Sequence, residues 1–415
     1  MGTKKKTTKT VAERKKTTKK AAVAGDPLRE PVRRGARKKV GKGARSSARS
    51  KARGKVTRSP ATASLKELQQ KYSKDVHGSG IAESNRLADM DVAETPRMFV
   101  STGSLSLDRS LTPPWSKDGG IPLGRVTEIV GPAHIGKTTT LDHIFANCQR
   151  VGGVSVLIET DTKRDSYYTK KIGVNLEELN VIEFKDWADQ NMENVWDQVA
   201  SAVEFWRREA PDVPVIVGVD ALGVTPTQDE VKKTLAQGTT ASAARINRKA
   251  CRKISGLVSN SNVGIVLLNH EYTSISFGGP VKPKKVYGGE AIELLATVRL
   301  KLHPVQNGWL KDRKGVILGR VVGFDLRKFK LGPAHTEGRY AILSSVGIDN
   351  VWTVYDRLSA CNYIQTAGSW SALNLGGDEV LKFQGFLGLR DKCLENPELF
   401  GRLVAAYRGT YDANV

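Results

Sequence analysis

Residues 131–138 read Gly-Pro-Ala-His-Ile-Gly-Lys-Thr, and the organisation of the whole chain follows from this stretch. It has the form G-x-x-x-x-G-K-T, in which glycines let the backbone curl so that its N–H groups point at phosphate oxygens. Residues 125–130 (RVTEIV) alternate and are β-branched, which predicts a strand, and residues 138–149 predict a helix. The alternative, a chance turn that happens to contain glycine and lysine, is not expected to have a strand directly before it and a helix directly after it. The stretch therefore predicts a phosphate-binding loop between a strand and a helix.

This arrangement indicates a P-loop NTPase that uses ATP and Mg²⁺. The N-terminus of the following helix adds a partial positive charge that attracts phosphate. Lys137 is expected to reach the β- and γ-phosphates, and the Thr138 hydroxyl is expected to hold Mg²⁺. The predicted nucleotide-binding residues of the loop are Gly131, Pro132, Ala133, His134, Ile135, Gly136, Lys137, Thr138 and Thr139.

Beyond the loop, predicted strands alternate with helices. An amphipathic helix is expected over residues 192–206, where apolar side chains repeat at spacings of three and four. Near-continuous apolar strands separated by helices predict an α/β fold whose mainly parallel, twisted sheet is covered on both faces. The strands are predicted at residues 154–159, 180–184, 213–219, 263–269, 297–302, 319–325 and 340–344.

One of these strands ends in an acid. Residues 214–220 read PVIVGVD, an apolar run that closes with Asp220. In a P-loop fold an acid at this place lies beside the phosphate loop and helps to hold Mg²⁺. Many strands end in Asp, but combined with the loop at this separation the pattern predicts Asp220 as a metal ligand.

The basic charge of the chain is concentrated at its N-terminus. Of 415 residues, the first 60 hold 22 of the 65 Lys and Arg but 3 of the 43 Asp and Glu, so they carry most of the net charge of +22. These 60 residues contain no aromatic side chain, and such a segment is expected to be disordered. We interpret it as a non-specific nucleic-acid tether that binds phosphate charge, with a solubilising or targeting tail as the alternative.

Cysteines and hydropathy point to a cytoplasmic protein without a membrane segment. The four cysteines lie far apart and show no metal-binding or disulfide spacing. No apolar run reaches the roughly 18 residues that cross a bilayer. The predicted location is the cytoplasm, in association with the nucleoid, or the host cytoplasm for a viral protein.

Four segments are expected along the chain. Residues 1–60 are the basic tail, and residues 61–98 contain a short oligomerisation helix, which begins at the capping box Ser64-x-x-Glu67, and a linker. Residues 99–346 form the ATPase core. Residues 347–415 form a small α/β cap, in which residues 381–407 are expected to be helical with a break near Asn396-Pro397.

From about residue 61 onward the chain resembles RecA-type homologous recombinases. The motifs that carry the resemblance are residues 101–108 (STGSLSLD), the phosphate loop, Tyr287-Gly288-Gly289 and Val298-Arg299-Leu300. The pair Asn269-His270 is most similar to the phage UvsX-like branch. The resemblance implies a RecA-like core and a filament that forms on single-stranded DNA.

The resemblance also implies roles around the nucleotide. Asp161 falls at the position of the catalytic carboxylate, with Glu159 as the alternative; Asp161 could instead cap the following turn. Asp165 and Tyr168 match positions that contact adenine, although without the resemblance a tyrosine here would more often be plain packing. His270 matches the γ-phosphate sensor, and a histidine there would make sensing depend weakly on pH.

Further implied roles concern DNA and a neighbouring subunit. Two loops, residues 226–241 and 271–287, are expected to line a DNA channel, the second with an apolar side chain that separates bases. Lys328 and Lys330 match lysines that reach the neighbour's ATP, with an exposed pair at a strand end as the alternative. The predicted DNA-binding residues are Phe277, Lys282, Lys284 and Lys285 of the second loop and Arg245, Arg248 and Arg252, which share one helix face.

The predicted function is that of an ATP-dependent recombinase and DNA-dependent ATPase. It would coat single-stranded DNA as a homo-oligomeric helical filament, pair it with homologous double-stranded DNA and exchange strands. A single-strand-binding protein or a loader is a possible partner. The alternative is a RecA-fold DNA-dependent motor or regulatory ATPase without strand exchange. A DNA-packaging protein with a decayed ATPase is disfavoured, because Gly136-Lys137-Thr138 and Asp220 are intact.

Overall fold

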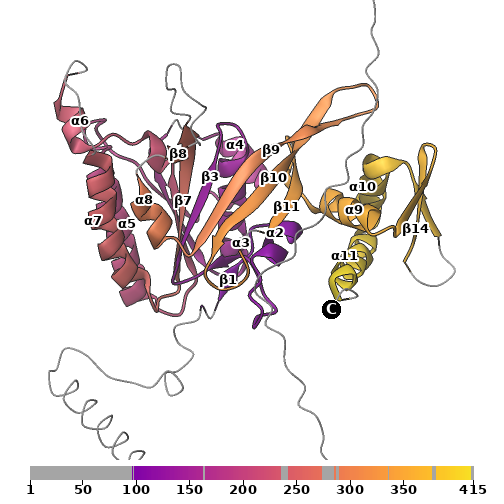
Figure 1. Cartoon of the computed structure of the whole chain (residues 1–415), viewed down its shortest axis with the longest axis horizontal. Coiled ribbons are helices and arrows are strands. Elements are labelled where there is room, and N and C mark those ends of the chain that lie inside the picture. The colour runs from indigo at the N-terminus through magenta and orange to yellow at the C-terminus, as the bar shows by residue number, and fades with distance from the viewer. Residues whose placement is uncertain are drawn as a thin grey trace, which may run out of the picture. The chain divides into compact units, whose positions relative to one another are not determined.

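A computed structural model describes residue 96 and residues 98–161, 164–234, 242–272, 285–286, 289–334, 336–375 and 380–412. Its dominant element is a ten-stranded sheet with strand order β12-β11-β10-β9-β3-β7-β6-β4-β5, in which β8 also pairs with β7 (Figure 1). These strands are β3 (Val126–Gly131), β4 (Val154–Glu159), β5 (Leu179–Ile182), β6 (Val215–Asp220), β7 (Val263–Tyr272), β8 (Lys285–Val286), β9 (Val298–Lys311), β10 (Ile317–Phe329), β11 (Glu337–Leu343) and β12 (Gly347–Asp349).

The predicted parallel core is confirmed, and an antiparallel extension is added to it. Strands β9, β3, β7, β6, β4 and β5 pair in parallel. From β9 to β12 every pairing is antiparallel. Among the residues described between β9 and β12 there is no helix, and short connections return a chain antiparallel to itself. The strands predicted at residues 297–302 and 319–325 are thus the paired parts of a longer hairpin.

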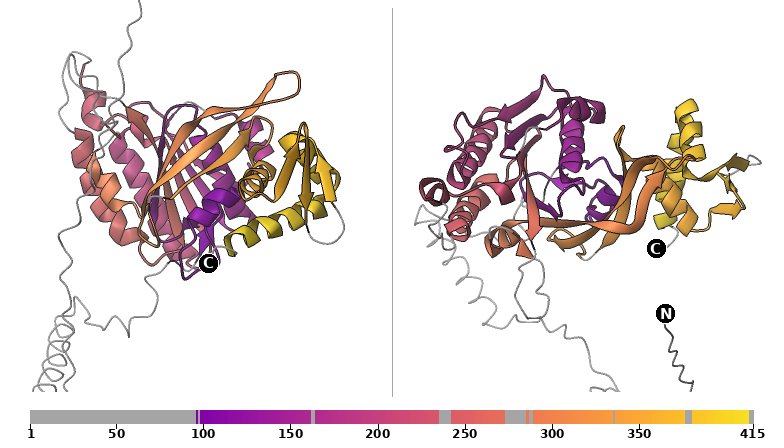
Figure 2. Two further views of the ribbon diagram at one scale, coloured as in Figure 1. Left: turned by 45° about the vertical axis from the view of Figure 1, so that its right-hand side comes forward. Right: turned by 90° about the horizontal axis from the view of Figure 1, so that it is seen from above.

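Helices cover both faces of the sheet, as the sequence predicts (Figures 1 and 2). Helix α3 (Lys137–Arg150) packs on one face, while α5 (Met192–Glu209), α7 (Ser242–Val258) and α8 (Glu290–Leu295) pack on the other. Gly218, in the middle of β6, allows the close approach of α3. A Cβ at this position would lie 2.6 Å from Cζ of Phe145, so any larger residue would push the helix away.

Shorter elements surround this core. They are β1 (Phe99–Val100), α2 (Leu105–Ser110), β2 (Ile121–Pro122), α4 (Ser166–Ile172), η2 (Leu222–Val224) and α6 (Gln228–Lys232). Helix α2 begins where the Ser104 hydroxyl accepts the N–H of Leu107. Helix α4 begins where the Asp165 carboxylate accepts the N–H groups of Tyr167 and Tyr168.

The C-terminal elements have a hydrophobic core of their own, which includes Val354, Leu358, Phe383, Leu389 and Leu403. They are α9 (Asn350–Ala360), the antiparallel strands β13 (Ile364–Ala367), β14 (Trp370–Asn374) and β15 (Val380–Phe383), and the helices α10 (Gly385–Glu395) and α11 (Pro397–Asp412).

The first residue predicted for the C-terminal helix is wrong. The helix predicted from residue 381 begins at Gly385, because Val380–Phe383 pairs with β14 and buries Phe383 in the local core. The predicted break is confirmed, since α10 ends at Glu395 and α11 begins at Pro397. The basic tail and the helix expected after Ser64 lie outside the described residues. Among the helices that the structure describes, none combines the length and the apolar character needed to span a bilayer.

Candidate nucleotide site and DNA-binding surface

The phosphate loop lies between the end of β3 and the start of α3. Gly136 has φ +103°, a left-handed conformation that favours glycine, and a Cβ there would lie 2.3 Å from Cδ1 of Ile342. No side chain caps the N-terminus of α3. Its first N–H groups therefore have no capping oxygen and are arranged to receive an anion.

Lys137 is buried and turned back over this loop. Its Nζ donates to the carbonyl oxygens of Gly131 (3.1 Å) and Pro132 (2.9 Å) and lies 3.4 Å from Nδ1 of His270. Burial lowers the pKa of Lys137, while the carboxylates of Asp220 and Asp161 oppose that shift. The ammonium group thus lies within the loop, where β- and γ-phosphates are expected.

Thr138 and Asp220 form the predicted metal pair. The Thr138 Oγ1 donates to Oδ2 of Asp220 at 2.8 Å, which joins the first turn of α3 to the end of β6. Such hard oxygen ligands fit Mg²⁺, which is usually held by one or two protein groups together with phosphates and waters. The described residues contain no cluster of three His, Cys, Asp or Glu side chains that could hold a metal alone. The pair fits a magnesium ion completed by a nucleotide.

The two candidate catalytic carboxylates differ in their surroundings. Asp161 is exposed, its N–H donates to the Asp220 carbonyl at 3.2 Å, and its charge raises the pKa of Lys137 and of His270. Glu159 is instead engaged by Arg164, whose Nε lies 3.3 Å from its Oε1. This geometry favours Asp161, because its charge acts on both Lys137 of the loop and His270 of β7.

The two predicted adenine contacts lie at the start of α4. Oδ1 of Asp165 accepts from the N–H groups of Tyr167 (3.0 Å) and Tyr168 (3.3 Å), so Asp165 is the cap of this helix rather than Asp161. The Tyr168 side chain is hydrogen-bonded to Thr139, and burial raises its pKa. Tyr168 therefore lies beside the first turn of α3, next to the phosphate loop.

His270 lies near the end of β7, in contact with Lys137. Burial lowers its pKa, and the positive charge of Lys137 lowers it further, so the neutral imidazole is favoured near pH 7. The Oδ1 of Asn269 accepts the N–H of His270 at 2.9 Å. The neutral ring can donate one hydrogen bond toward a γ-phosphate, as the predicted sensor role requires.

Sequence reasoning missed a charged cluster in this site. Arg164 forms ion pairs with Asp142 of α3, Glu159 of β4 and Asp220 of β6. The sequence did contain a signal: Asp142 falls among the apolar residues Leu141, Ile144 and Phe145 of a predicted helix. A carboxylate buried there needs a partner, but the pattern alone could not identify Arg164.

Comparison with known proteins identifies the family. The sequence matches the family described as RecA N-terminal domain over residues 63–349. The chain belongs to the RecA family. It is 30% identical to Protein RecA of Oleidesulfovibrio alaskensis over 345 residues, which cover 83% of this chain and 89% of that protein. It is 32% identical to Protein RecA of Methylobacterium sp. over 311 residues, with 74% and 78% covered.

Membership of the RecA family establishes the general activity. The chain is an ATP-dependent DNA recombinase and a DNA-dependent ATPase. The family implies that ATP is bound together with Mg²⁺, which agrees with the fit of Thr138 and Asp220. The closer likeness to a phage UvsX-like branch stays a prediction.

The two predicted DNA loops of this RecA-family chain are partly ordered elements. Within residues 226–241 the chain forms α6, which starts at a capping box between Thr227 and Glu230, so this part is not a loop. At both ends of residues 271–287 there is strand, because Glu271 pairs with Val286 and Tyr272 with Lys285. Phe277, Lys282 and Lys284 lie outside the described residues.

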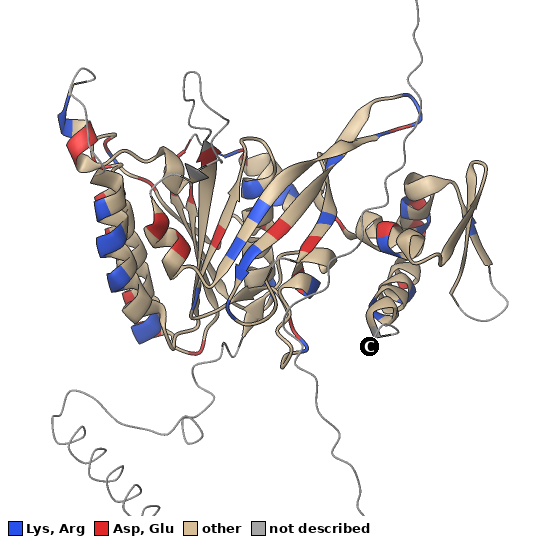
Figure 3. Cartoon of the chain, in the orientation of Figure 1, with Lys and Arg blue, Asp and Glu red and all other residues tan. Residues whose placement is uncertain are grey.

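Helix α7 presents the predicted basic face. Arg245, Arg248 and Arg252 are exposed, whereas Cys251, Ile254 and Val258 are buried against the sheet. In Figure 3, successive turns of this helix carry Lys or Arg. The helical spacing therefore separates an apolar stripe, which packs, from a charged one, which faces solvent.

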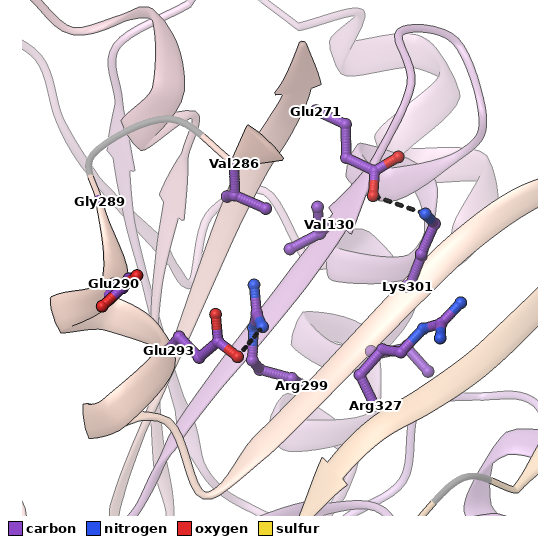
Figure 4. Close-up of a pocket in the computed structure, with 10 residues that line it drawn as sticks. Val130, Glu271, Val286, Gly289, Glu290, Glu293, Arg299, Lys301 and Arg327 are labelled. Carbon is purple, nitrogen blue, oxygen red and sulfur yellow. Dashed lines mark ion pairs between the residues drawn. The ribbon is translucent and has the colours of Figure 1, made fainter. Parts of the chain in front are cut away.

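A charged cavity of about 490 Å³ lies beside the base of the second loop (Figure 4). Lys301 of β9 pairs with Glu271 of β7 at 2.8 Å, and Arg299 pairs with Glu293 of α8 at 2.9 Å. Arg299 also donates to the buried Glu128, which accepts from Asn269 as well. These contacts connect the end of β7, next to His270, with the start of β9.

Lys328 and Lys330 do not join the nucleotide site of their own chain. Lys328 is in register with Arg299 of β9, which pairs with Glu128 in the middle of β3, whereas the phosphate loop follows the end of β3. The Lys328 Nζ donates to the Leu294 carbonyl at 3.1 Å, at the C-terminus of α8. Burial lowers the pKa of Lys328, and the positive charge of Lys330 lowers it further.

Proposed function

We propose that this RecA-family recombinase forms a helical filament on single-stranded DNA and holds ATP and Mg²⁺ at the phosphate loop of each subunit. The observation that carries the proposal is the convergence of Lys137, the Thr138–Asp220 pair and His270 at the ends of three neighbouring parallel strands. Strand β7 leads from His270 directly into the second predicted DNA loop. Nucleotide binding and DNA binding are therefore adjacent along one strand.

The side chains have distinct roles in this proposal. Lys137 exchanges the Gly131 and Pro132 carbonyls for β- and γ-phosphate oxygens, and Tyr168 provides a ring for the adenine beside Asp165. Thr138 and Asp220 hold Mg²⁺, which when bound neutralises charge on the β- and γ-phosphates. Asp161 accepts a proton from, or orients, the attacking water. Glu159 is the weaker candidate, because its carboxylate is paired with Arg164.

His270 connects the nucleotide with DNA. A γ-phosphate that accepts a hydrogen bond from the ring would pull the end of β7 toward the phosphate loop. Asn269 and Glu271 flank His270, and they are tied to Glu128 and Lys301 by contacts of 3.0 and 2.8 Å. A displacement at His270 is therefore transmitted to β9 and to the base of the second predicted loop, residues 271–287, where Phe277, Lys282, Lys284 and Lys285 are expected to contact DNA.

The two lysines at the end of β10 act on the neighbouring subunit. Across β9, Lys328 and Lys330 are level with the first half of β3, whereas their own phosphate loop follows its far end, so a second copy of the chain would bring its nucleotide to them. Positive charge supplied in this way stabilises the transition state of phosphoryl transfer, as an arginine finger does. ATP hydrolysis then depends on assembly.

The remaining segments serve recruitment. Residues 1–60 act as a basic tether for DNA, residues 61–98 dock on a neighbouring copy, residues 99–346 are the ATPase core and residues 347–415 are the cap. Arg245, Arg248 and Arg252 contact DNA phosphates. Double-stranded DNA is the second substrate, a single-strand-binding protein or loader assists assembly, and the site of action is the cytoplasm, at the nucleoid or on viral DNA.

The proposal is tested by measuring ATP hydrolysis with and without single-stranded DNA, strand exchange with a homologous duplex, and filaments by electron microscopy. Single-stranded DNA should raise the hydrolysis rate strongly, and strand exchange should require ATP. A mixture of Lys328→Ala/Lys330→Ala subunits with Lys137→Ala subunits should regain hydrolysis only if the site is shared. A hydrolysis rate independent of DNA, together with absent strand exchange, would favour a motor or regulatory ATPase.

A further inference from the structure

Arg164 lies at the centre of a cluster of three carboxylates beside the phosphate loop. Its Nη1 contacts Oδ1 of Asp142, its Nε lies 3.3 Å from Oε1 of Glu159, and its Nη2 lies 2.9 Å from Oδ2 of Asp220. The Arg164 side chain is 10% exposed. A planar guanidinium is suited to this task, because its five N–H donors point in fixed and different directions.

The same oxygen of Asp220 serves two partners. Oδ2 accepts from Nη2 of Arg164 at 2.9 Å and from Oγ1 of Thr138 at 2.8 Å. Thr138 and Asp220 are the proposed Mg²⁺ ligands, and Mg²⁺ takes its ligand oxygens at roughly 2.0–2.1 Å. An ion bound between them would thus lie next to the guanidinium, and two positive charges at this separation repel each other.

Asp142 anchors the guanidinium away from the metal. Its side chain is 1% exposed, and its Oδ2 accepts from Oγ1 of Thr169 at 3.0 Å, so it is fixed between α3 and α4. Separating Arg164 from this buried carboxylate would leave the charge of Asp142 uncompensated. The contact with Asp220, whose side chain is 11% exposed, is the one that can be given up.

We propose that Arg164 is a positioning residue that competes with Mg²⁺ for Asp220 and thereby sets the Mg²⁺ concentration at which nucleotide binds. The guanidinium of Arg164 holds the Asp220 carboxylate in place beside Thr138. To bind Oδ2 of Asp220, Mg²⁺ would have to displace the guanidinium from this oxygen, while the contact with Asp142 keeps the guanidinium in the cluster. Three carboxylates against one guanidinium leave two negative charges, which one divalent cation balances. Arg164 therefore weakens Mg²⁺ binding without preventing it. This inference rests on the proposed role of Asp220.

The test measures binding of a fluorescent ATP analogue to the full chain while Mg²⁺ is titrated, without DNA, so that the readout is independent of hydrolysis. The variant Arg164→Leu/Asp142→Leu removes the competing charge and its anchor together and fills the space with apolar side chains. Its half-saturating Mg²⁺ concentration should fall at least tenfold relative to the unmodified chain. Arg164→Lys, which keeps the charge but not the fork, should give a smaller decrease.

Two further variants make the result specific. Arg150→Leu removes an exposed arginine from the last turn of the same helix as Asp142 and should leave the Mg²⁺ requirement unchanged. Asp220→Asn should raise the requirement. If the half-saturating Mg²⁺ concentration is unchanged or higher in both Arg164 variants, while Asp220→Asn raises it, Arg164 does not compete with Mg²⁺ and the proposal is wrong. Without any effect of Asp220→Asn, the metal assignment itself would be wrong.

A purely structural role for Arg164 predicts a different outcome. The variants would then lower thermal stability and nucleotide affinity at saturating Mg²⁺, while the half-saturating Mg²⁺ concentration stayed the same. If the double variant does not fold, Arg164→Lys alone decides the question, because the ammonium cannot contact all three carboxylates at once. A Mg²⁺ requirement in Arg164→Lys equal to that of the unmodified chain would then reject the proposal.

Discussion

Arg164 and Arg248 are the same residue type placed in opposite environments. Arg164 is almost buried and contacts carboxylates from α3, β4 and β6, whereas Arg248 is exposed on α7 beside Arg245 and Arg252. A buried guanidinium with several partners is fixed in one orientation and acts on its immediate neighbours. An exposed one attracts a distant polyanion, and salt screens that attraction.

The two regions therefore place charge for different purposes. At the proposed nucleotide site, the ion pairs of Arg164 join α3, β4 and β6, whose relative positions we expect to matter for phosphate and metal binding. On α7 we expect the charges to act additively on DNA, so that the positions of individual side chains matter less. The comparison predicts large and local effects of substitution in the first region, and small and graded effects in the second.

The largest effect is expected at the phosphate loop. Lys137→Ala should reduce DNA-stimulated ATP hydrolysis at least about 100-fold, because it removes a preorganised positive charge from the γ-phosphate. Nucleotide-dependent filaments should be lost as well. The matched control is Lys170→Ala, an exposed lysine on α4, which should keep both activities. Unchanged hydrolysis and filaments in Lys137→Ala would show that the site is elsewhere.

The next effect concerns the stability of the charged cluster. Arg164→Leu should lower the free energy of unfolding by about 3 kcal/mol, because it leaves the buried Asp142 carboxylate without its cation. Arg164→Leu/Asp142→Leu should regain most of this loss. Urea unfolding followed by circular dichroism measures both. Equal loss in the single and the double variant would mean that packing, not charge, sets the cost.

His143 of α3 extends the comparison to a buried group that has no acid to pair with in the described contacts. Its Nε2 accepts the N–H of Ile348 at 2.8 Å, and burial lowers its pKa to about 4. His143 is neutral in the folded protein. Its contribution to the free energy of unfolding is therefore fully present above the ordinary histidine pKa and is lost as the pH falls toward 4. Between pH 7 and pH 5 this loss should be about 2 kcal/mol.

The measurement for His143 is urea unfolding at several pH values. His143→Gln should remove the loss of stability between pH 7 and pH 5. The control variant His303→Gln, which replaces a partly exposed histidine of β9, should retain this loss. If His143→Gln loses stability between pH 7 and pH 5 as steeply as the unmodified chain, protonation of other groups is responsible.

The smallest effects are expected on α7. Arg245→Ser, Arg248→Ser and Arg252→Ser should each weaken binding of single-stranded DNA a few-fold, equally for all sequences, and reduce the salt dependence by about one phosphate contact. Arg408→Ser on α11 removes an equally exposed arginine and serves as the control. Fluorescence anisotropy at several salt concentrations measures this. A loss confined to particular sequences would indicate base contacts.

Most of the core could be predicted because its signals are local. The G-x-x-x-x-G-K-T loop needs a particular backbone, and residues 214–220 place an acid at the end of a buried strand. The surrounding strands and helices could be predicted because apolar residues repeat every two residues on the buried side of a strand and about every 3.6 residues on the buried side of a helix. The same periodicity placed Arg245, Arg248 and Arg252 on an exposed face.

The two errors in secondary structure have different causes. Residues 228–232 form α6 at the capping box Thr227-x-x-Glu230, a local signal that sequence reasoning missed. Residues 380–383 form β15 because β14 offers them a strand to pair with, which no local period predicts. Short segments have weak preferences of their own, and tertiary contacts override them.

The sequence by itself determined the phosphate loop, the acid at the end of β6 and the apolar sides of the helices, because each depends on residues close together in the chain. Only the tertiary structure decided which charges meet. Glu159 and Asp220 end the parallel strands β4 and β6, Asp142 lies on α3, and Arg164 follows β4 and reaches all three. An ion pair forms only when two charged groups are close in space, and the pattern of residues along the chain does not show which distant residues come that close.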